Sequence, residues 1–194
     1  MPLSNPQPRK AIHKRAIDCI GYEREDGLWD IEAHLVDTKT VVHTRRSGEP
    51  ARQPGDPIHN MWIRLTIDLD MVIHDAEAKT DDSPYQTCGD ITVLFKQLIG
   101  VKIAAGWRRE VNIRVGGVKG CAHLTELLGP LATTAFQATG RARDARNTAQ
   151  ATGKRPYQLN SCHIFAEDSI HTLHRWPQFY TGPKPTGKGK NEPA

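Results

Sequence analysis

The amino-acid sequence predicts an α+β domain: an antiparallel sheet of about four to six strands with helices packed on one face. Two observations predict this fold. The first part of the chain alternates apolar and polar side chains with a period of two, and the part after Pro84 repeats apolar residues at helical spacing. Strands that precede helices along the chain are typical of α+β proteins with an antiparallel sheet. The helices are therefore expected mainly in the C-terminal half.

The 194 residues suffice for one domain with extensions at its ends. Three prolines among the first ten residues predict a disordered N-terminal lead over residues 1–12. A composition rich in Gly, Pro and Lys predicts a disordered basic tail over residues 181–194. The single α+β domain is expected to span residues 13–180.

Charge and composition narrow the expected partners. The formal net charge is +4, and Lys and Arg are spread along the chain outside the tail, so nucleic acid is not indicated. No apolar run has the length of a membrane span, and the N-terminus lacks an apolar signal segment. We therefore expect a cytoplasmic protein without a membrane partner. Its four cysteines are then thiols or ligands rather than disulfides: Cys19, Cys88, Cys121 and Cys162.

The clearest alternation in the chain lies within residues 26–39. One side of this expected strand is apolar and the other is ionisable: Trp29, Ile31, Ala33 and Leu35 against Asp30, Glu32 and His34. A two-residue turn at Asp26-Gly27 would pair this strand with a first strand over residues 16–24. In that register Cys19 lies opposite His34, and the apolar side also carries Ile20 and Tyr22.

A second hairpin is expected after a turn-rich loop over residues 40–58. Its first strand, residues 59–68, points Met61, Ile63, Leu65 and Ile67 one way and Trp62, Arg64 and Thr66 the other. A turn at Leu69-Asp70 places Arg64 opposite Asp75 and Leu65 opposite His74. The polar face then gains Asp75 and Glu77, and the apolar face gains Val72, His74 and Ala76.

Apolar residues repeat at helical spacing in three stretches of the second half of the chain. The expected helices cover residues 91–98, ended by Gly100, then residues 106–115, broken by Gly116-Gly117, and residues 121–143. The longest has an apolar stripe of Leu124, Leu127, Leu128, Leu131, Ala135 and Ala138, and Pro130 inside it should kink it or start a new helix. Residues 157–180 predict a further hairpin or a cover over the domain.

The polar sheet face is the first candidate site. Close carboxylates raise each other's pKa, and a neighbouring arginine counters this effect, which favours general acid–base chemistry. The alternative is a solvated face with cross-strand ion pairs. His59 lies at the start of a strand beside the long loop, where a base or a substrate-orienting residue is expected.

The second candidate cluster is Gly120–Glu126, at the start of the longest expected helix. His123 and Glu126 share a helical face, and a helix N-terminus lowers the pKa of a cysteine, so Cys121 is a candidate nucleophile. The alternatives are a structural role and a metal site that Cys121 forms with His123, Cys88 or the Cys162-His163 pair. No CxxC pair is present, and we expect no metal. No Walker loop, GxGxxG turn, GxSxG elbow or HExxH is present, which disfavours nucleotide and classical serine-hydrolase chemistry.

Three stretches, Tyr22–Lys39, Pro57–Asp68 and Gly120–Phe136, resemble a bacterial family described as domain of unknown function 2889. The likeness runs from about Ala16 to Ala138 and weakly through Cys162-His163. The resemblance implies an association with bacteria that degrade aromatic compounds, including lignin-derived phenylpropanoids, where small lyases work without a cofactor. At position 60 the family is expected to carry Asp, whereas this chain has Asn60.

The leading hypothesis is a cofactor-independent lyase acting on a small aromatic metabolite, such as release of formaldehyde from a phenylpropanoid dimer. A carboxylate or histidine takes the proton of the departing hydroxymethyl group, and an acid assists opening of a neighbouring ether. The candidate catalytic residues are Asp30, Glu32, His34, His59, Arg64, Asp75 and Glu77. The candidate substrate-binding residues are Tyr22, Arg24, Trp62 and His123. The alternatives are a non-enzymatic small-molecule binding protein, dimeric through an exposed sheet edge, and a Cys/His metal-binding enzyme.

Overall fold

The computed structural model describes residues 3–44, 50–149 and 155–183. The chain divides into two compact units, residues 1–146 and residues 147–194, and each is described by itself. The single domain over residues 13–180 and the disordered lead therefore stay predictions. Most of the predicted basic tail, residues 184–194, lies outside the described residues.

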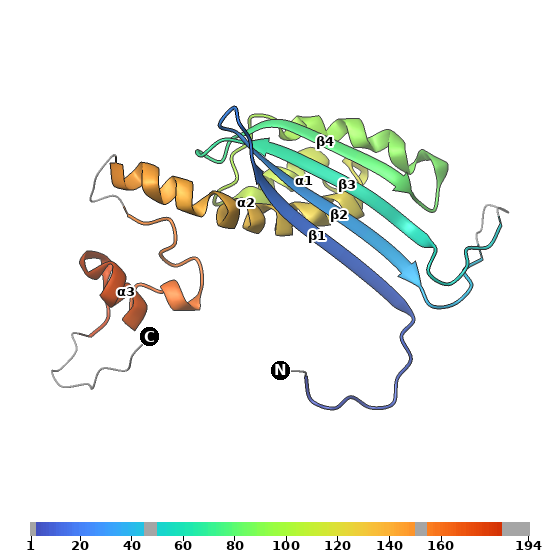
Figure 1. The fold of residues 1–194 in the computed structure, drawn as a ribbon, viewed down its shortest axis with the longest axis horizontal. Helices are drawn as coiled ribbons and strands as arrows, with labels where there is room; N and C mark the ends of the chain where they lie inside the picture. The colour runs from blue at the N-terminus through green and yellow to red at the C-terminus, as the bar shows by residue number, and fades with distance from the viewer. Residues whose placement is uncertain (1–2, 45–49, 150–154, 184–194) are drawn as a thin grey trace. The chain divides into compact units, whose positions relative to one another are not determined.

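The first unit is a four-stranded antiparallel sheet followed by helices, which confirms the predicted α+β fold. The strands are β1 (His13–Glu23), β2 (Trp29–Lys39), β3 (Pro57–Ile67) and β4 (Ile73–Asp82), and they lie in the order β1-β2-β3-β4. After them come the 3₁₀ helices η1 (Gln86–Leu98) and η2 (Gly117–Lys119) and the α-helices α1 (Trp107–Val115) and α2 (Ala122–Ala149). Figure 1 shows α1 and α2 lying together along one side of the sheet.

The core lies between the sheet and these helices. The expected apolar sides of β2 and β3 are both buried, and Ile31, Leu35 and Leu65 are fully inaccessible to solvent. Leucines of α2 and residues of η1 and α1 pack against them: Leu124, Leu127, Leu128, Leu131, Phe95, Leu98, Trp107, Val111 and Val115. Burial of such side chains, about 1.5–3 kcal/mol each, is the main force that holds the helices on this face.

The β1–β2 turn differs from the predicted two-residue turn. The loop has three residues, because Gly27 N donates to Arg24 O and Arg24 N donates to Leu28 O, with Gly27 at φ 83°. The extra residue shifts the register by one, so Cys19 lies opposite Ala33 rather than His34. The prediction that Ile20 and Tyr22 share the apolar side was therefore wrong. They lie opposite Glu32 and Asp30 on the open face, half exposed.

The β3–β4 turn also has three residues. Met71 N donates to Asp68 O and Asp68 N donates to Val72 O, with Met71 at φ 66°. A register irregularity follows at Thr66/Ile67, so Arg64 lies opposite Glu77 and not opposite Asp75, and Leu65 lies opposite Ala76 and not opposite His74.

The polar side of β4 is as predicted, since Asp75 and Glu77 share the face of Arg64. Ala76 is buried as predicted. His74 is not on the apolar face: the irregularity turns it outward, where its Nε2 lies 2.8 Å from Asp68 Oδ2. Ile73 is buried on the core side in its place, and Val72 is outside the core cluster.

The helices follow the expected spacing. The left-handed Gly100, at φ 82°, follows η1, and α1 lies between Gly106 and Gly116. The longest helix, α2, continues through Pro130 without ending there. Among the described residues, no helix is long and apolar enough to cross a membrane.

The second unit contains short helices rather than the predicted hairpin. Its described part holds the 3₁₀ helices η3 (His163–Phe165) and η4 (Pro177–Phe179) and the α-helix α3 (Ile170–Arg175). Ser169 caps α3 by accepting a hydrogen bond from Thr172 N at 3.1 Å, and its hydroxyl oxygen also lies 3.3 Å from Thr172 Oγ1. Phe165 packs its ring near those of His171 and Trp176.

Gly21 marks a close approach of β1 to α2. A Cβ atom at this position would lie 2.5 Å from Ala138 Cβ. We expect Gly21→Ala to lower the free energy of unfolding by about 1–3 kcal/mol, since strand and helix must move apart. Gly89→Ala is the matched control, because a Cβ at Gly89 would meet nothing within 4 Å. Urea unfolding curves measure both, and equal midpoints for the two variants would contradict the close packing.

Candidate functional site

Ionisable side chains lie on the core side of the sheet at one of its ends. Arg15 of β1, Asp37 of β2 and His59 of β3 fall on the face that carries Leu35 and Met61, because alternate residues of a strand share a face. Asp37 is 1% exposed. A carboxylate in such a place requires compensating partners.

Three basic side chains surround Asp37. Arg15 donates from Nε to Oδ1 at 2.8 Å and from Nη2 to Oδ2 at 2.7 Å, which is a two-pronged ion pair. His59 Nδ1 lies 2.9 Å from Oδ2, and His13 Nε2 lies 3.2 Å from Oδ1. The two carboxylate oxygens are thus contacted by four nitrogen atoms.

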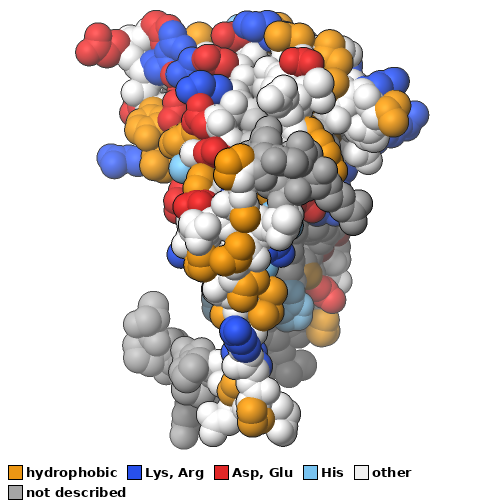
Figure 2. All heavy atoms as spheres, turned by 90° about the vertical axis from the view of Figure 1, so that its right-hand side faces the viewer, with side chains coloured by type: hydrophobic (Ala, Val, Ile, Leu, Met, Phe, Trp, Pro, Cys, Tyr) orange, Lys and Arg blue, Asp and Glu red, His pale blue; other side chains and the backbone are white. Residues whose placement is uncertain are grey.

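The start of α2 completes this cluster. The His123 ring packs against the His59 ring, tilted by 31° with centroids 3.8 Å apart, and Glu126 accepts a hydrogen bond from Arg15 Nη1 at 2.6 Å. Cys121 Sγ lies 3.9 Å from His123 Nδ1. Figure 2 faces the side of the molecule on which β2 ends and α2 begins. We call Arg15, Asp37, His59, His123 and Glu126 the Asp37 cluster.

The charges of the cluster set the protonation of its members. Burial raises the pKa of Asp37, but the hydrogen bonds and charge of Arg15, followed by those of His59, bring it down to about 2. Burial lowers the pKa of His59, and the neighbouring His123 lowers it further. Burial and the charge of Arg15 lower the pKa of His123 as well. Near pH 7 the cluster therefore holds a charged Asp37–Arg15 pair beside two neutral imidazoles.

This geometry suits proton transfer. An ionised carboxylate at Nδ1 keeps the proton of His59 on that nitrogen, so Nε2 carries the free lone pair and is the nitrogen that can accept a proton. The His59 side chain is 12% exposed and so is not sealed from solvent. His59 thus has a fixed tautomer, a fixed orientation and a carboxylate to stabilise its protonated form.

The same place is a candidate metal centre. Within the described residues, Asp37, His59 and His123 form a group in which one ligand atom from each lies within 4.8 Å of the others. A carboxylate with two histidines is the ligand set of many iron and zinc sites. The guanidinium of Arg15 opposes a cation here, because it is already paired with both oxygens of Asp37. None of the expected cysteine ligands belongs to this group.

The predicted polar sheet face exists, and its side chains are mostly paired with one another. Arg64 bridges Glu32, at 3.5 Å, and Glu77, while Asp75 pairs with Lys96 at 3.0 Å. His34 stacks on Trp62 with centroids 3.5 Å apart, and its Nε2 lies 2.7 Å from Asn60 Oδ1.

Asp30 accepts hydrogen bonds from Thr66 Oγ1 at 2.6 Å and from Arg24 at 3.2 Å. These cross-strand contacts match the alternative of a solvated, ion-paired sheet face. A hollow of about 130 Å³ lies among Glu32, Trp62, Arg64, Glu77 and Lys79. The open face carries all of the predicted site residues except His59 and His123. Tyr22 lies on it opposite Asp30.

The sequence pattern indicated His59 and His123 as separate candidates, and the structure brings them together. The pattern-based candidates did not include Asp37, Arg15 or His13. A signal for Asp37 was present: it follows Trp29, Ile31, Ala33 and Leu35 in the same alternation, so it is an acidic residue in the apolar phase of its strand. His59 precedes Met61 and Ile63 in the same way.

Comparison with known proteins gives one finding. The model of the family described as protein of unknown function (DUF2889) matches residues 13–137, which is more than half of the chain, and the chain belongs to this family. The matched region holds all four strands and every member of the Asp37 cluster. No curated protein and no solved structure matches the chain.

The histidine pair predicts a dependence of stability on pH. The folded state holds the pKa of His59 and His123 below the value of 6.5, so on acidification the unfolded chain binds protons first. The free energy of unfolding should therefore fall as the pH drops below about 6.5. Asp37 adds a second loss as the pH falls from about 3.8 to about 2.

Urea unfolding at a series of pH values measures this effect. His59→Gln should flatten the dependence between pH 5 and about 6.5, since it removes one of the two neighbouring imidazoles. His74→Gln removes a histidine outside the cluster and should keep the wild-type slope. A slope that is the same in all three proteins would show that the His59–His123 pair does not cause it.

Proposed function

We propose that the chain is an acid–base enzyme that works without a cofactor, with His59 as the base and Asp37 as the residue that orients it. The observation that carries this proposal is the buried Asp37 carboxylate, 2.9 Å from His59 Nδ1 and paired with Arg15. A buried, fully paired carboxylate behind a partly accessible imidazole is the arrangement by which enzymes hold a histidine ready for proton transfer.

The specific reaction we propose is a lyase step: release of formaldehyde from a small aromatic substrate such as a phenylpropanoid dimer. His59 Nε2 takes the proton of the hydroxymethyl O–H, and the carbon–carbon bond breaks as the C=O bond of formaldehyde forms. The released electron pair forms a carbon–carbon double bond and expels the neighbouring ether oxygen. That oxygen takes the proton back from His59, so one imidazole serves first as base and then as acid.

The other members of the cluster have supporting roles in this proposal. Asp37 stabilises the imidazolium that exists between the two proton transfers. Arg15 keeps Asp37 ionised near neutral pH, because its hydrogen bonds and charge, with those of His59, lower the pKa of that carboxyl to about 2. His123 lies against the His59 ring and limits its rotation. Glu126 fixes Arg15 from α2.

A second candidate is a metal-dependent enzyme at the same place. The observation that favours it is the set of three ligand atoms within 4.8 Å of one another. A metal bound there would use His59 and His123, and it would have to share Asp37 with Arg15. A chelator distinguishes the two candidates, because only the metal-dependent enzyme would lose turnover.

Substitution of His59 tests the proposed base. In purified protein that turns over hydroxymethyl-bearing phenolic dimers, His59→Gln should reduce kcat/KM by about 10²–10⁴-fold, because the base is lost. The readout is formaldehyde formed per enzyme. His74→Gln is the matched control, since it removes a histidine paired with Asp68 elsewhere in the sheet. Equal activity of the two variants, or absence of turnover across such dimers, would contradict the proposal.

Removal of bound metal ions distinguishes the two candidate functions. Treatment with EDTA followed by gel filtration should leave kcat unchanged, because Arg15 occupies the carboxylate that a cation would need. Elemental analysis of the treated protein checks that no zinc or iron remains. Loss of turnover that returns on addition of zinc or iron would favour the metal-dependent alternative.

A further inference from the structure

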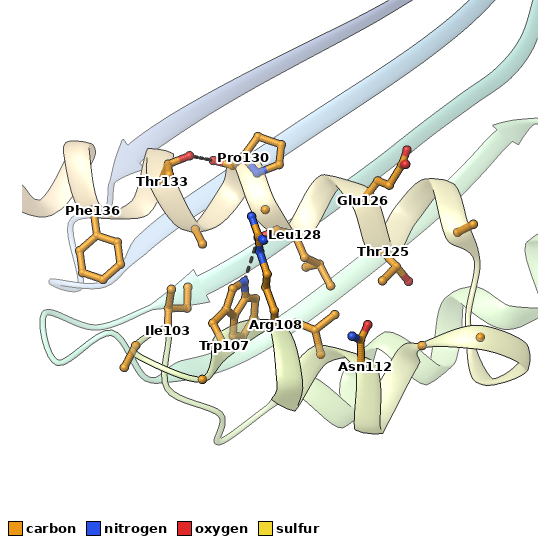
Figure 3. Close-up of a pocket in the computed structure, with 18 residues that line it drawn as sticks. Ile103, Trp107, Arg108, Asn112, Thr125, Glu126, Leu128, Pro130, Thr133 and Phe136 are labelled. Atoms are coloured by element: carbon orange, nitrogen blue, oxygen red, sulfur yellow. Dashed lines mark hydrogen bonds between the residues drawn. The ribbon is translucent and has the colours of Figure 1, made fainter. Parts of the chain in front are cut away.

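A second candidate site lies between α1 and α2. A groove of about 1050 Å³ runs between α1 and α2, and its floor is formed by buried apolar residues: Ile103, Trp107, Val111, Leu128 and Ala132. Trp107 Nε1 donates to Leu128 O at 2.9 Å and so joins the two helices across this floor (Figure 3). Grooves of roughly 300–1,000 Å³ hold small ligands in other proteins.

Gly129 leaves open space along the groove. It lies within α2 and lines the groove, and a Cβ atom built on it would meet nothing within 4 Å. Packing within the chain therefore does not require a glycine here. A glycine inside a helix costs about 1 kcal/mol relative to alanine. The open Cβ position lets a ligand approach the helix backbone closely.

Two polar side chains of α1 identify the chemistry of the occupant. Arg108 and Asn112 are four residues apart, which places them on one helical face, and Figure 3 shows Arg108 reaching from α1 towards α2. Neither side chain forms a hydrogen bond or ion pair with any residue in the described part of the chain. The other charged residue of the groove, Glu126, is paired with Arg15. The groove thus offers one uncompensated positive charge beside an amide, above an apolar floor.

We infer that this groove binds a small aromatic carboxylate. The ring lies on the floor against Trp107 and Leu128, next to Gly129, and the carboxylate pairs with Arg108, with the Asn112 amide as a second donor. A single arginine suits a monoanion better than a phosphate dianion, whose second charge would have no partner. This inference does not depend on the proposed lyase chemistry, because binding is measured without turnover.

The test uses the full chain with trans-cinnamate as the probe. The readouts are the dissociation constant from calorimetry and the shift of the Trp107 indole N–H resonance, which Trp107→Phe assigns. Cinnamate should move this resonance in a saturable manner. Gly129→Leu should weaken binding at least tenfold, since a Cβ at this position meets nothing within 4 Å and the longer side chain occupies the groove. Gly140→Leu is the matched control, from the same helix and with equal free space at its Cβ, and should bind as the wild type does.

The charge is tested separately. Arg108→Gln should weaken cinnamate binding about tenfold and leave the weaker binding of cinnamyl alcohol, its neutral analogue, unchanged. His59→Gln should leave cinnamate binding unchanged, so failure of the proposed acid–base function and failure of the groove site give different results. Equal binding in Gly129→Leu and Gly140→Leu would overturn the inference, as would cinnamate binding that does not move the Trp107 resonance.

Discussion

The buried carboxylate of Asp37 is the constraint on which one end of this structure depends. An ionised carboxylate that is 1% exposed is stable only when its charge and lone pairs are compensated, and removal of one partner from such a pair costs several kcal/mol. Arg15, His13 and His59 supply the donors from the strands on either side. The same contacts set the tautomer and orientation of His59 and bring His123 and Glu126 of α2 to the sheet.

The two hairpin turns decide which side chains belong to which face. Each loop has three residues and ends on a residue with positive φ, Gly27 in one case and Met71 in the other. A left-handed methionine is strained by about 1 kcal/mol, and burial of its side chain, which is 1% exposed, offsets this cost. Because side chains alternate along a strand, one added loop residue moved Ile20 and Tyr22 to the open face.

The candidate sites differ in how far the sequence predicts them. The polar face of Glu32, Arg64 and Glu77 stands where alternation places it, because it depends only on the period of each strand. Its side chains satisfy one another across strands. The Asp37 cluster combines residues that are more than a hundred positions apart, as in the Arg15–Glu126 pair. No local pattern contains such a contact, although an acidic residue in the apolar phase of a strand signals that one is needed.

The sequence by itself determined the α+β class, the buried sides of β2 and β3, the helix expected over residues 106–115 and the apolar stripe of α2. These features follow from periodicities within single elements, which the side-chain pattern encodes directly. The tertiary structure decided the strand registers, the outward turn of His74 and the meeting of Asp37, His59 and His123. Those depend on turn geometry and on long-range packing, where a shift of one residue exchanges the two faces of a strand.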